Sequence, residues 1–390
     1  MNIKTTLKTS VAAAALFALA APVATPASAD IKNGNKNSLT ISGWVAKALW
    51  YADDGEQDQL FITDGSTSRS RVRWIASGTV NEDVTAGALI EMDIPLSNPQ
   101  DNQLLTDNGE TSGPGTDKDW AIRHQYVWVN HKKFGKLALG QTDAAANGNM
   151  EGLLSGTTAI DLSSAKPFGS GLTFINDTGA TPSRSATNVN AVIKNLDFTS
   201  RTDVIRYDTP SFKGFGLAAS LNGAGGGEVG GRYTCKFNAF SVEARAGYSE
   251  NSSSDGAEVT NGDYTLGGSV AVLHDSGLNA SFAGGKVELE TGGNRTPYFW
   301  YVSGGYRAKI FKIGGTDFNV GYNRSKQMSA KGDEADSIGI TALQNFDPIG
   351  ANIAVFWRRY DLEQKRATAG QGRESFDEID VFGLQTVFNF

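Results

Sequence analysis

The 390-residue sequence has few residues of the kinds that build disulfides, metal sites or membrane helices: one cysteine, three histidines and ten prolines. A single cysteine, Cys235, excludes an internal disulfide framework and any zinc or iron–sulfur site made of several cysteines. After residue 30, no apolar run reaches the roughly 18 residues that a membrane-spanning helix needs. The chain is therefore neither a disulfide-rich small domain nor a helical membrane protein.

Positive charge is also scarce. The chain has 35 Lys and Arg against 42 Asp and Glu, which gives a formal net charge of −7. It contains no long run of Lys or Arg, and binding to nucleic-acid phosphates requires concentrated positive charge. We expect no nucleic-acid partner.

Catalytic motifs are missing as well. Residues 225–230 fit the GxGxxG pattern, but strand-like alternation follows them, whereas a nucleotide fingerprint opens a helix. No GxSxG, HExxH or Walker motif is present. We therefore expect no enzyme and no cofactor.

The N-terminus is typical of an exported protein. Residues 1–8 are positively charged, an apolar stretch spans 11–21, and Ala27-Ser28-Ala29 is a small-x-small cleavage pattern. This predicts a signal peptide at 1–29 and a single mature domain at 30–390. The mature chain has a formal net charge of −9, because Lys4 and Lys8 lie in the leader and no acidic residue does.

From Leu39 onward, apolar residues recur at every second position, which is the period of a β-strand. Sixteen segments show it: 39–51, 69–78, 84–95, 120–131, 136–142, 203–209, 214–221, 230–237, 240–249, 263–273, 278–289, 298–311, 317–327, 334–344, 351–361 and 378–390. Short turns follow the even-numbered segments, and mostly long connections follow the odd-numbered ones. This asymmetry, with segments of about ten residues and aromatic residues near their ends, favours an all-β, antiparallel transmembrane β-barrel over a soluble sandwich.

Several short motifs resemble general Gram-negative porins, and they come in the order of that family. They are SRVRW at 70–74, NED at 81–83, AGALIE at 86–91, RHQYVWV at 123–129, FGKLALGQ at 134–141, RYDTP at 206–210 and the ending GLQTVFNF at 383–390. The resemblance implies a homotrimeric, 16-stranded barrel in the bacterial outer membrane, with a long third loop folded into the lumen. It also implies a passive diffusion channel for small hydrophilic solutes and ions.

Charged side chains within the strands are expected to face a water-filled lumen, because a cation on the lipid face costs about 2–4 kcal/mol near the midplane. Arg71 and Arg73 lie two residues apart and therefore share a face with Arg69. The predicted pore-lining residues are Arg69, Arg71, Arg73, Glu91, Asp93, Arg123, Arg245, Arg307, Lys309 and Arg358.

The connection 143–201 is much longer than the others, and loops longer than about 15 residues usually have a function or are disordered. It is the expected constriction loop. By the resemblance, it would bring its acidic residues Asp143, Glu151 and Asp161 opposite Arg69–Arg73.

The outer segments around 53–64 and 101–119 are acidic, which predicts a weak cation preference. Divalent cations at these carboxylates could bridge to lipopolysaccharide, and outer-membrane lipid and lipopolysaccharide are therefore expected partners. A substrate-specific channel for a sugar or an organic acid remains the alternative, with Trp50, Trp120, Trp300 and Tyr301 as a sugar-stacking track. A barrel enzyme using His124 or His131 and an adhesin are less favoured.

Overall fold

The computed structural model describes residues 37–67, 69–94, 120–164, 168–176, 182–223, 225–250, 262–289, 295–365 and 373–390. The predicted leader at 1–29 and the acidic residues at 101–119 lie outside this part of the chain. No helix among the described residues is long and apolar enough to cross a membrane.

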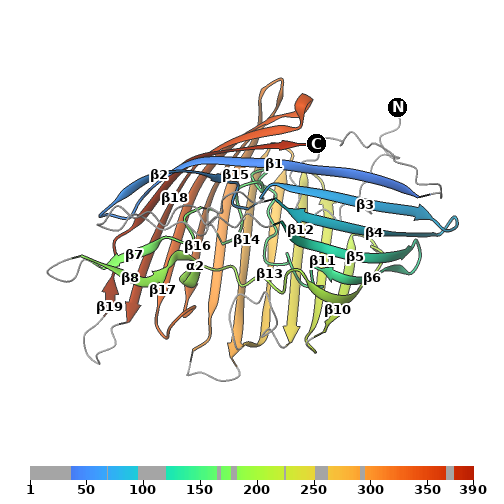
Figure 1. The fold of residues 1–390 in the computed structure, drawn as a ribbon, viewed down its shortest axis with the longest axis horizontal. Coiled ribbons are helices and arrows are strands. Elements are labelled where there is room, and N and C mark those ends of the chain that lie inside the picture. The colour runs from blue at the N-terminus through green and yellow to red at the C-terminus, as the bar shows by residue number, and fades with distance from the viewer. Residues whose placement is uncertain are drawn as a thin grey trace.

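Antiparallel strands follow one another around the molecule (Figure 1). The strands of the main sheet are β1 (Ser38–Asp53), β2 (Asp58–Asp64), β3 (Arg71–Thr79), β4 (Val84–Asp93), β5 (Ala121–His131), β6 (Gly135–Thr142), β9 (Thr202–Asp208), β10 (Phe215–Asn222), β11 (Gly227–Phe237), β12 (Phe240–Glu250), β13 (Gly262–His274), β14 (Leu278–Leu289), β15 (Tyr298–Phe311), β16 (Gly314–Lys326), β17 (Glu334–Phe346), β18 (Ala351–Lys365), β19 (Arg373–Ser375) and β20 (Ile379–Asn389). A short 3-10 turn, Asp347–Ile349, joins β17 to β18.

The sheet closes on itself because β1 pairs with β20. β2 and β3 both pair with β1, over Lys47–Asp53 and Ser38–Trp44 respectively. In the same way, β19 and β20 both pair with β18. β2 and β3 together cross the barrel wall once, and β19 and β20 together do the same. The 18 described strands of the main sheet therefore cross the wall 16 times. The predicted 16-stranded antiparallel β-barrel is confirmed.

The second crossing differs from its prediction. The sequence placed its start at residue 69 and assigned Asp58 and Asp64 to an acidic connection, whereas both lie in β2, and Asp64 is paired with Lys47 of β1. Gly65, Ser66 and Thr67 lie outside the strands, as do Arg69 and Ser70. The N–H of Ser66 donates to Gln385 Oε1 at 3.3 Å, and the Thr67 hydroxyl donates to the carbonyl of Ala159. This polar interruption breaks the two-residue period, and only the second half of the crossing was therefore detected.

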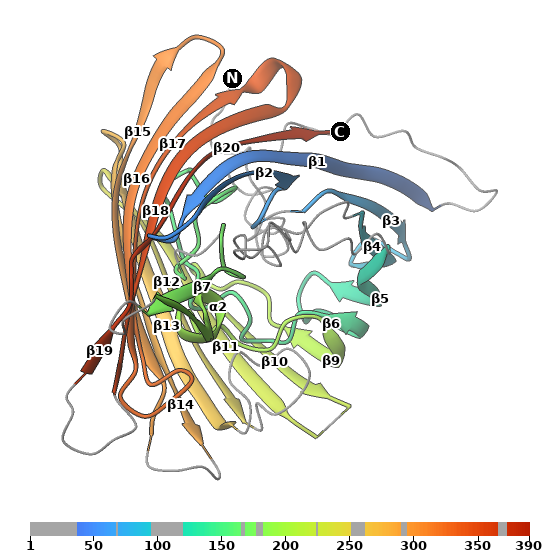
Figure 2. The same cartoon turned by 60° about the vertical axis from the view of Figure 1, so that its left-hand side comes forward.

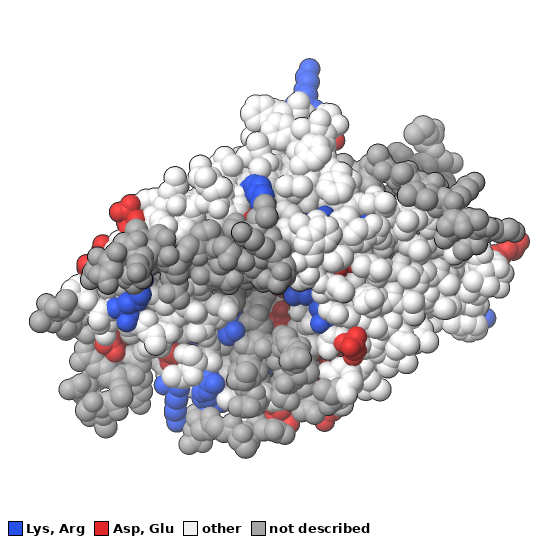
Figure 3. All heavy atoms as spheres, viewed as in Figure 1, with Lys and Arg blue, Asp and Glu red and all other residues white. Residues whose placement is uncertain are grey.

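One face of the sheet is apolar and exposed. On β5, Val127 and Val129 are 55% and 51% exposed, whereas Tyr126, which precedes them and points to the opposite face, is 7% exposed. The charged side chains are sparse on the face drawn in Figure 3, where most of the described surface is neither acidic nor basic. An apolar outer band of this kind is what a lipid-facing barrel requires.

The connection between β6 and β9 lies within the curve of the strands (Figure 2). It contains β7 (Thr173–Asn176), β8 (Ser183–Asn188) and the one-turn helix α2 (Val189–Val192). Its apolar side chains pack against the inner face of the barrel: Phe168 stacks on Phe356 of β18, with ring centroids 4.5 Å apart, and lies 5.8 Å from Trp50 of β1. Apolar side chains of the connection therefore cover this part of the inner face.

This packing affects the expected sugar track. Trp50 and Tyr301 are each 1% exposed, so neither presents a ring face to water. Trp120 is 57% exposed, and the Trp300 ring lies 5.2 Å from Tyr322 on the outward face of β15 and β16. The structure does not bring these four aromatic residues together.

Candidate functional site

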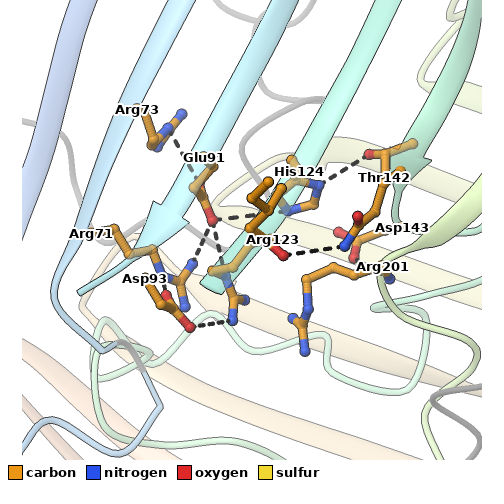
Figure 4. A network of polar contacts seen from close by, with 11 residues as sticks. Arg71, Arg73, Glu91, Asp93, Arg123, His124, Thr142, Asp143 and Arg201 are labelled. Carbon is orange, nitrogen blue, oxygen red and sulfur yellow. Dashed lines mark hydrogen bonds and ion pairs between the residues drawn. The ribbon is translucent and has the colours of Figure 1, made fainter. Parts of the chain in front are cut away.

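Three neighbouring strands, β3, β4 and β5, place a network of charged side chains on the inner face (Figure 4). Arg71 lies opposite Asp93 in the β3–β4 register, and Arg73 lies opposite Glu91. Arg71 contacts Glu91 at 3.2 Å and Asp93 at 3.1 Å, and Arg73 contacts Glu91 at 3.4 Å. The guanidinium carbons of Arg71 and Arg73 lie 4.8 and 5.9 Å from the ring centroid of Trp44. The alternation of side chains along a strand explains this grouping.

A β-bulge adds Arg123 to the network. Glu91 is paired with His124 and Met92 with Ile122, so Arg123 is the extra residue on β5. A bulge re-aims a side chain, and Arg123 reaches Glu91 at 3.0 Å and Asp93 at 3.1 Å. We call Arg71, Arg73, Arg123, Glu91 and Asp93 the arginine cluster. Its arginine side chains are 11–16% exposed and its carboxylate side chains 5–7%, so guanidinium groups form most of its accessible surface.

The start and end of the long connection meet beside this cluster. His124 Nδ1 lies 3.2 Å from the hydroxyl of Thr142, and Asp143 accepts a hydrogen bond from the N–H of Arg201 at 3.3 Å. Burial acts to raise the pKa of Asp143, but His124 and the guanidinium groups of Arg201, Arg206 and Arg123 outweigh it, so the pKa is lowered. The carboxylate is therefore held in its charged form.

A second set of arginines holds the first residues of the connection. Arg206 donates to the carbonyls of Asp143 and Ala144 at 2.9 and 3.1 Å. Arg232 donates to the carbonyl of Asn147 at 2.9 Å, and Arg245 donates to that of Gly148 at 2.7 Å. Arg245 was predicted, and the structure places it against the connection and against Glu243. Arg206 and Arg232 were missed, although their positions within strands carried the same signal.

Glu228 of β11 joins both ends of the connection. Its carboxylate accepts hydrogen bonds from the N–H groups of Ala146 and Thr199, each at 3.0 Å. The side chain is buried. Glu228 was also missed, because a single glutamate in a glycine-rich strand gives no sequence signal for a backbone contact.

Two predicted site residues, Asp161 and Arg358, form a buried ion pair with each other. Asn319 and Thr341 also donate to the Asp161 carboxylate, at 3.0 and 2.9 Å. Arg358 is therefore not exposed to water in a lumen, and Asp161 lies against β16–β18 rather than opposite Arg69–Arg73. The strand period correctly indicated that Arg358 faces inward, but it gave no information on the segment that covers it.

The remaining predicted residues lie apart from the arginine cluster. Glu151 accepts a hydrogen bond from Asn195 at 2.7 Å, within the connection. Arg69 is half-buried just before β3, Arg307 contacts Asp317 at 3.3 Å, and Lys309 is exposed near the end of β15. Among the described residues, no group of three or more His, Cys, Asp or Glu side chains is arranged to hold a metal ion.

The sequence matches a family model for Gram-negative porins over residues 11–364. The chain belongs to the Gram-negative porin family. This confirms the predicted family, an outer-membrane barrel that serves as a general diffusion channel and is not an enzyme.

Solved structures of outer-membrane proteins share this fold. In-vitro folded OmpT of Vibrio cholerae is similar with a TM-score of 0.58 at 13% identity, over 93% of this chain and 100% of that chain. Its trimer form gives 0.54 at 14% identity, over 91% and 100%. The anion-selective porin from Comamonas acidovorans gives 0.57 at 13% identity, also over 91% and 100%. No curated protein sequence matches this chain significantly.

Proposed function

We propose that this porin is a non-specific path for small hydrophilic solutes and ions, with the connection 143–201 as its constriction. The observation that carries the proposal is the position of this connection. It is fixed to the inner face at Glu228 and at Arg358, and its two ends meet beside the arginine cluster. The open part of the lumen would then run past Arg71, Arg73 and Arg123. Charged groups fixed around a narrow aqueous path favour polar solutes over apolar ones.

We propose a weak cation preference for small ions. The formal net charge of −9 in the mature chain and the acidic sequence 101–119 favour cations over anions near the channel. The arginine cluster acts in the opposite direction, because its guanidinium groups are more exposed than its carboxylates. These opposed fields account for a preference that is weak.

We also propose a homotrimer, supported by the trimer form of the similar OmpT structure. Lipopolysaccharide is a proposed partner at the rim that carries the long connections. There Arg324 and Lys326 of β16 and Arg359 of β18 lie on the outward face, beside the acidic residues Glu334 and Asp336. Divalent cations would bridge such carboxylates to lipid phosphate. Lipopolysaccharide binding that is lost on chelation with EDTA would support this bridge, and binding that is indifferent to EDTA would contradict it.

Planar-bilayer recording of the purified protein tests the channel. We expect stepwise currents in multiples of three, and a reversal potential in a KCl gradient with the sign of mild cation selectivity. An absence of current steps at every salt concentration would overturn the channel, and a clear anion preference would overturn the proposed selectivity.

A further inference from the structure

Lys136 is an inner-face lysine near the start of β6. Leu137 and Leu139 are 50% and 60% exposed on the outer face, and Ala138 is buried on the inner face. Lys136 lies two residues before Ala138 and therefore points to the same inner face. Its ammonium nitrogen lies 5.1 Å from the ring centroid of Tyr126 and 5.7 Å from that of Trp128. Cation–π contacts are attractive within about 6 Å. We call Tyr126, Trp128 and Lys136 the β5–β6 strip.

Lys136 forms no ion pair with a carboxylate in the part of the chain that the structure describes. Asp208 is its cross-strand neighbour on β9. That carboxylate, however, is held by Arg206, through contacts of 3.2, 3.1 and 2.7 Å. Arg71, Arg73 and Arg123 differ from Lys136, because each contacts at least one carboxylate.

The Trp128 side chain lies flat on the barrel wall. It stands opposite Gly87 of β4, and a Cβ at Gly87 would come within 2.6 Å of the indole ring. The wall covers one face of the indole, and Lys136 lies over the ring system from the neighbouring strand. An indole ring and an ammonium group that forms no ion pair among the described residues therefore adjoin each other on the inner face.

The strip continues from the arginine cluster along β5. The His124 ring, which lies 3.9 Å from Glu91, is edge-on to Tyr126 with ring centroids 6.4 Å apart. Trp128 and Lys136 follow, toward the turn at 132–134. A solute anion that leaves the arginine cluster would next meet Lys136.

We propose that the β5–β6 strip binds organic anions that carry a planar ring, with aromatic carboxylates as the substrate class. The carboxylate would pair with the Lys136 ammonium, and the ring would pack against Trp128 beside it. This inference rests on the proposed diffusion function. A small inorganic anion gains only the charge contact, and an uncharged ring gains only the stacking contact, so a solute with both is retained longest.

Block of the KCl current by benzoate tests the proposal on the intact protein in planar bilayers. Acetate, which has the charge without the ring, and benzyl alcohol, which has the ring without the charge, are the comparison solutes. We expect benzoate to block at a concentration about two- to fivefold lower than acetate does, which corresponds to one modest cation–π or stacking contact. Benzyl alcohol should block least.

Variants separate the strip from the rest of the channel. Lys136→Gln and Trp128→Leu should each raise the half-blocking concentration of benzoate to that of acetate, while KCl conductance persists. Lys286→Gln is the matched control, because Lys286 lies on the outward face of β14, where its ammonium nitrogen is 5.5 Å from the ring centroid of Tyr264. The strip proposal would be overturned if benzoate and acetate blocked the unmodified protein at the same concentration. It would also be overturned if benzoate blocked Lys136→Gln as strongly as the unmodified protein. Absence of KCl current in the unmodified protein would instead overturn the channel itself.

Discussion

Arg358 and Asp161 form an ion pair whose side chains are 1% and 2% exposed, between β18 and the long connection. Among the described residues, each charge is balanced by the other and by neutral groups: Thr157, Asn319 and Thr341 donate to Asp161. Removing one partner of a buried pair leaves an uncompensated charge, which costs about 3–5 kcal/mol.

We therefore expect Arg358→Met to lower the free energy of unfolding by about 3–5 kcal/mol. The double variant with Asp161→Asn should recover part of this loss, because no charge is then left buried alone. Arg359→Gln is the control, since Arg359 is 40% exposed and faces outward with Asp380. Urea titration in detergent measures the three variants. Equal stabilities of Arg358→Met and Arg359→Gln would contradict the role of the pair.

Glu228→Gln should loosen both ends of the connection. The amide offers one acceptor oxygen where the carboxylate offers two, so one of the contacts with Ala146 and Thr199 is lost. Hydrogen bonds to charged groups contribute about 1.5–3 kcal/mol each. We expect faster proteolysis within 143–201 and noisier single-channel current, with the barrel intact. Glu288→Gln on the outward face, where the side chain is 44% exposed, should change neither measurement.

The pH dependence of stability should show the lowered pKa of Asp143. A carboxylate with a lowered pKa contributes stability above its ordinary pKa, about 3.9, and loses it as the pH falls through the lowered value. The stability difference between the unmodified protein and Asp143→Asn should thus persist from pH 7 to about pH 5, and shrink below about pH 4. Unfolding measured across this range checks the prediction. A difference that already shrinks at neutral pH would show that Asp143 lacks this stabilisation by its neighbours.

Phe168 fixes the connection by apolar packing. It is fully buried between Trp50 and Phe356, so Phe168→Ala leaves a cavity and should cost about 3–5 kcal/mol. Because the connection 143–201 would pack less tightly against the barrel, single-channel conductance should also become more variable. Phe212→Ala is the control, because Phe212 is 72% exposed. If both variants behaved alike, the aromatic packing would not hold the connection in place.

The barrel could be predicted because each strand has its own signal. Alternation along β12, from Phe240 to Tyr248, requires no knowledge of any other strand, and closure follows once the strands are in order. β2 was not predicted, because residues 65–67 lie outside the strands and interrupt the pattern that defines a strand.

The site could be predicted only where the alternation of side chains along a strand decides which face a residue occupies. Parity placed Arg71, Arg73, Glu91 and Asp93 on one face, and these four residues do meet. Parity could not show that the connection 143–201 covers Arg358. The contacts of that connection depend on long-range packing, such as Phe168 on Phe356, for which a single sequence has no periodic signal.

The selectivity of the channel should depend on the arginine cluster. Replacing Arg71 and Arg73 by Gln removes two positive charges from the proposed path and leaves Glu91 and Asp93 with Arg123 as their remaining partner in the cluster. The exposed charge of this wall would become negative, and the permeability ratio of potassium to chloride should rise roughly twofold or more. A reversal potential across a KCl gradient measures the ratio, with Arg359→Gln on the outward face as control. If the reversal potential of the double variant equals that of the control, ions do not pass along the cluster, and the open lumen must lie elsewhere.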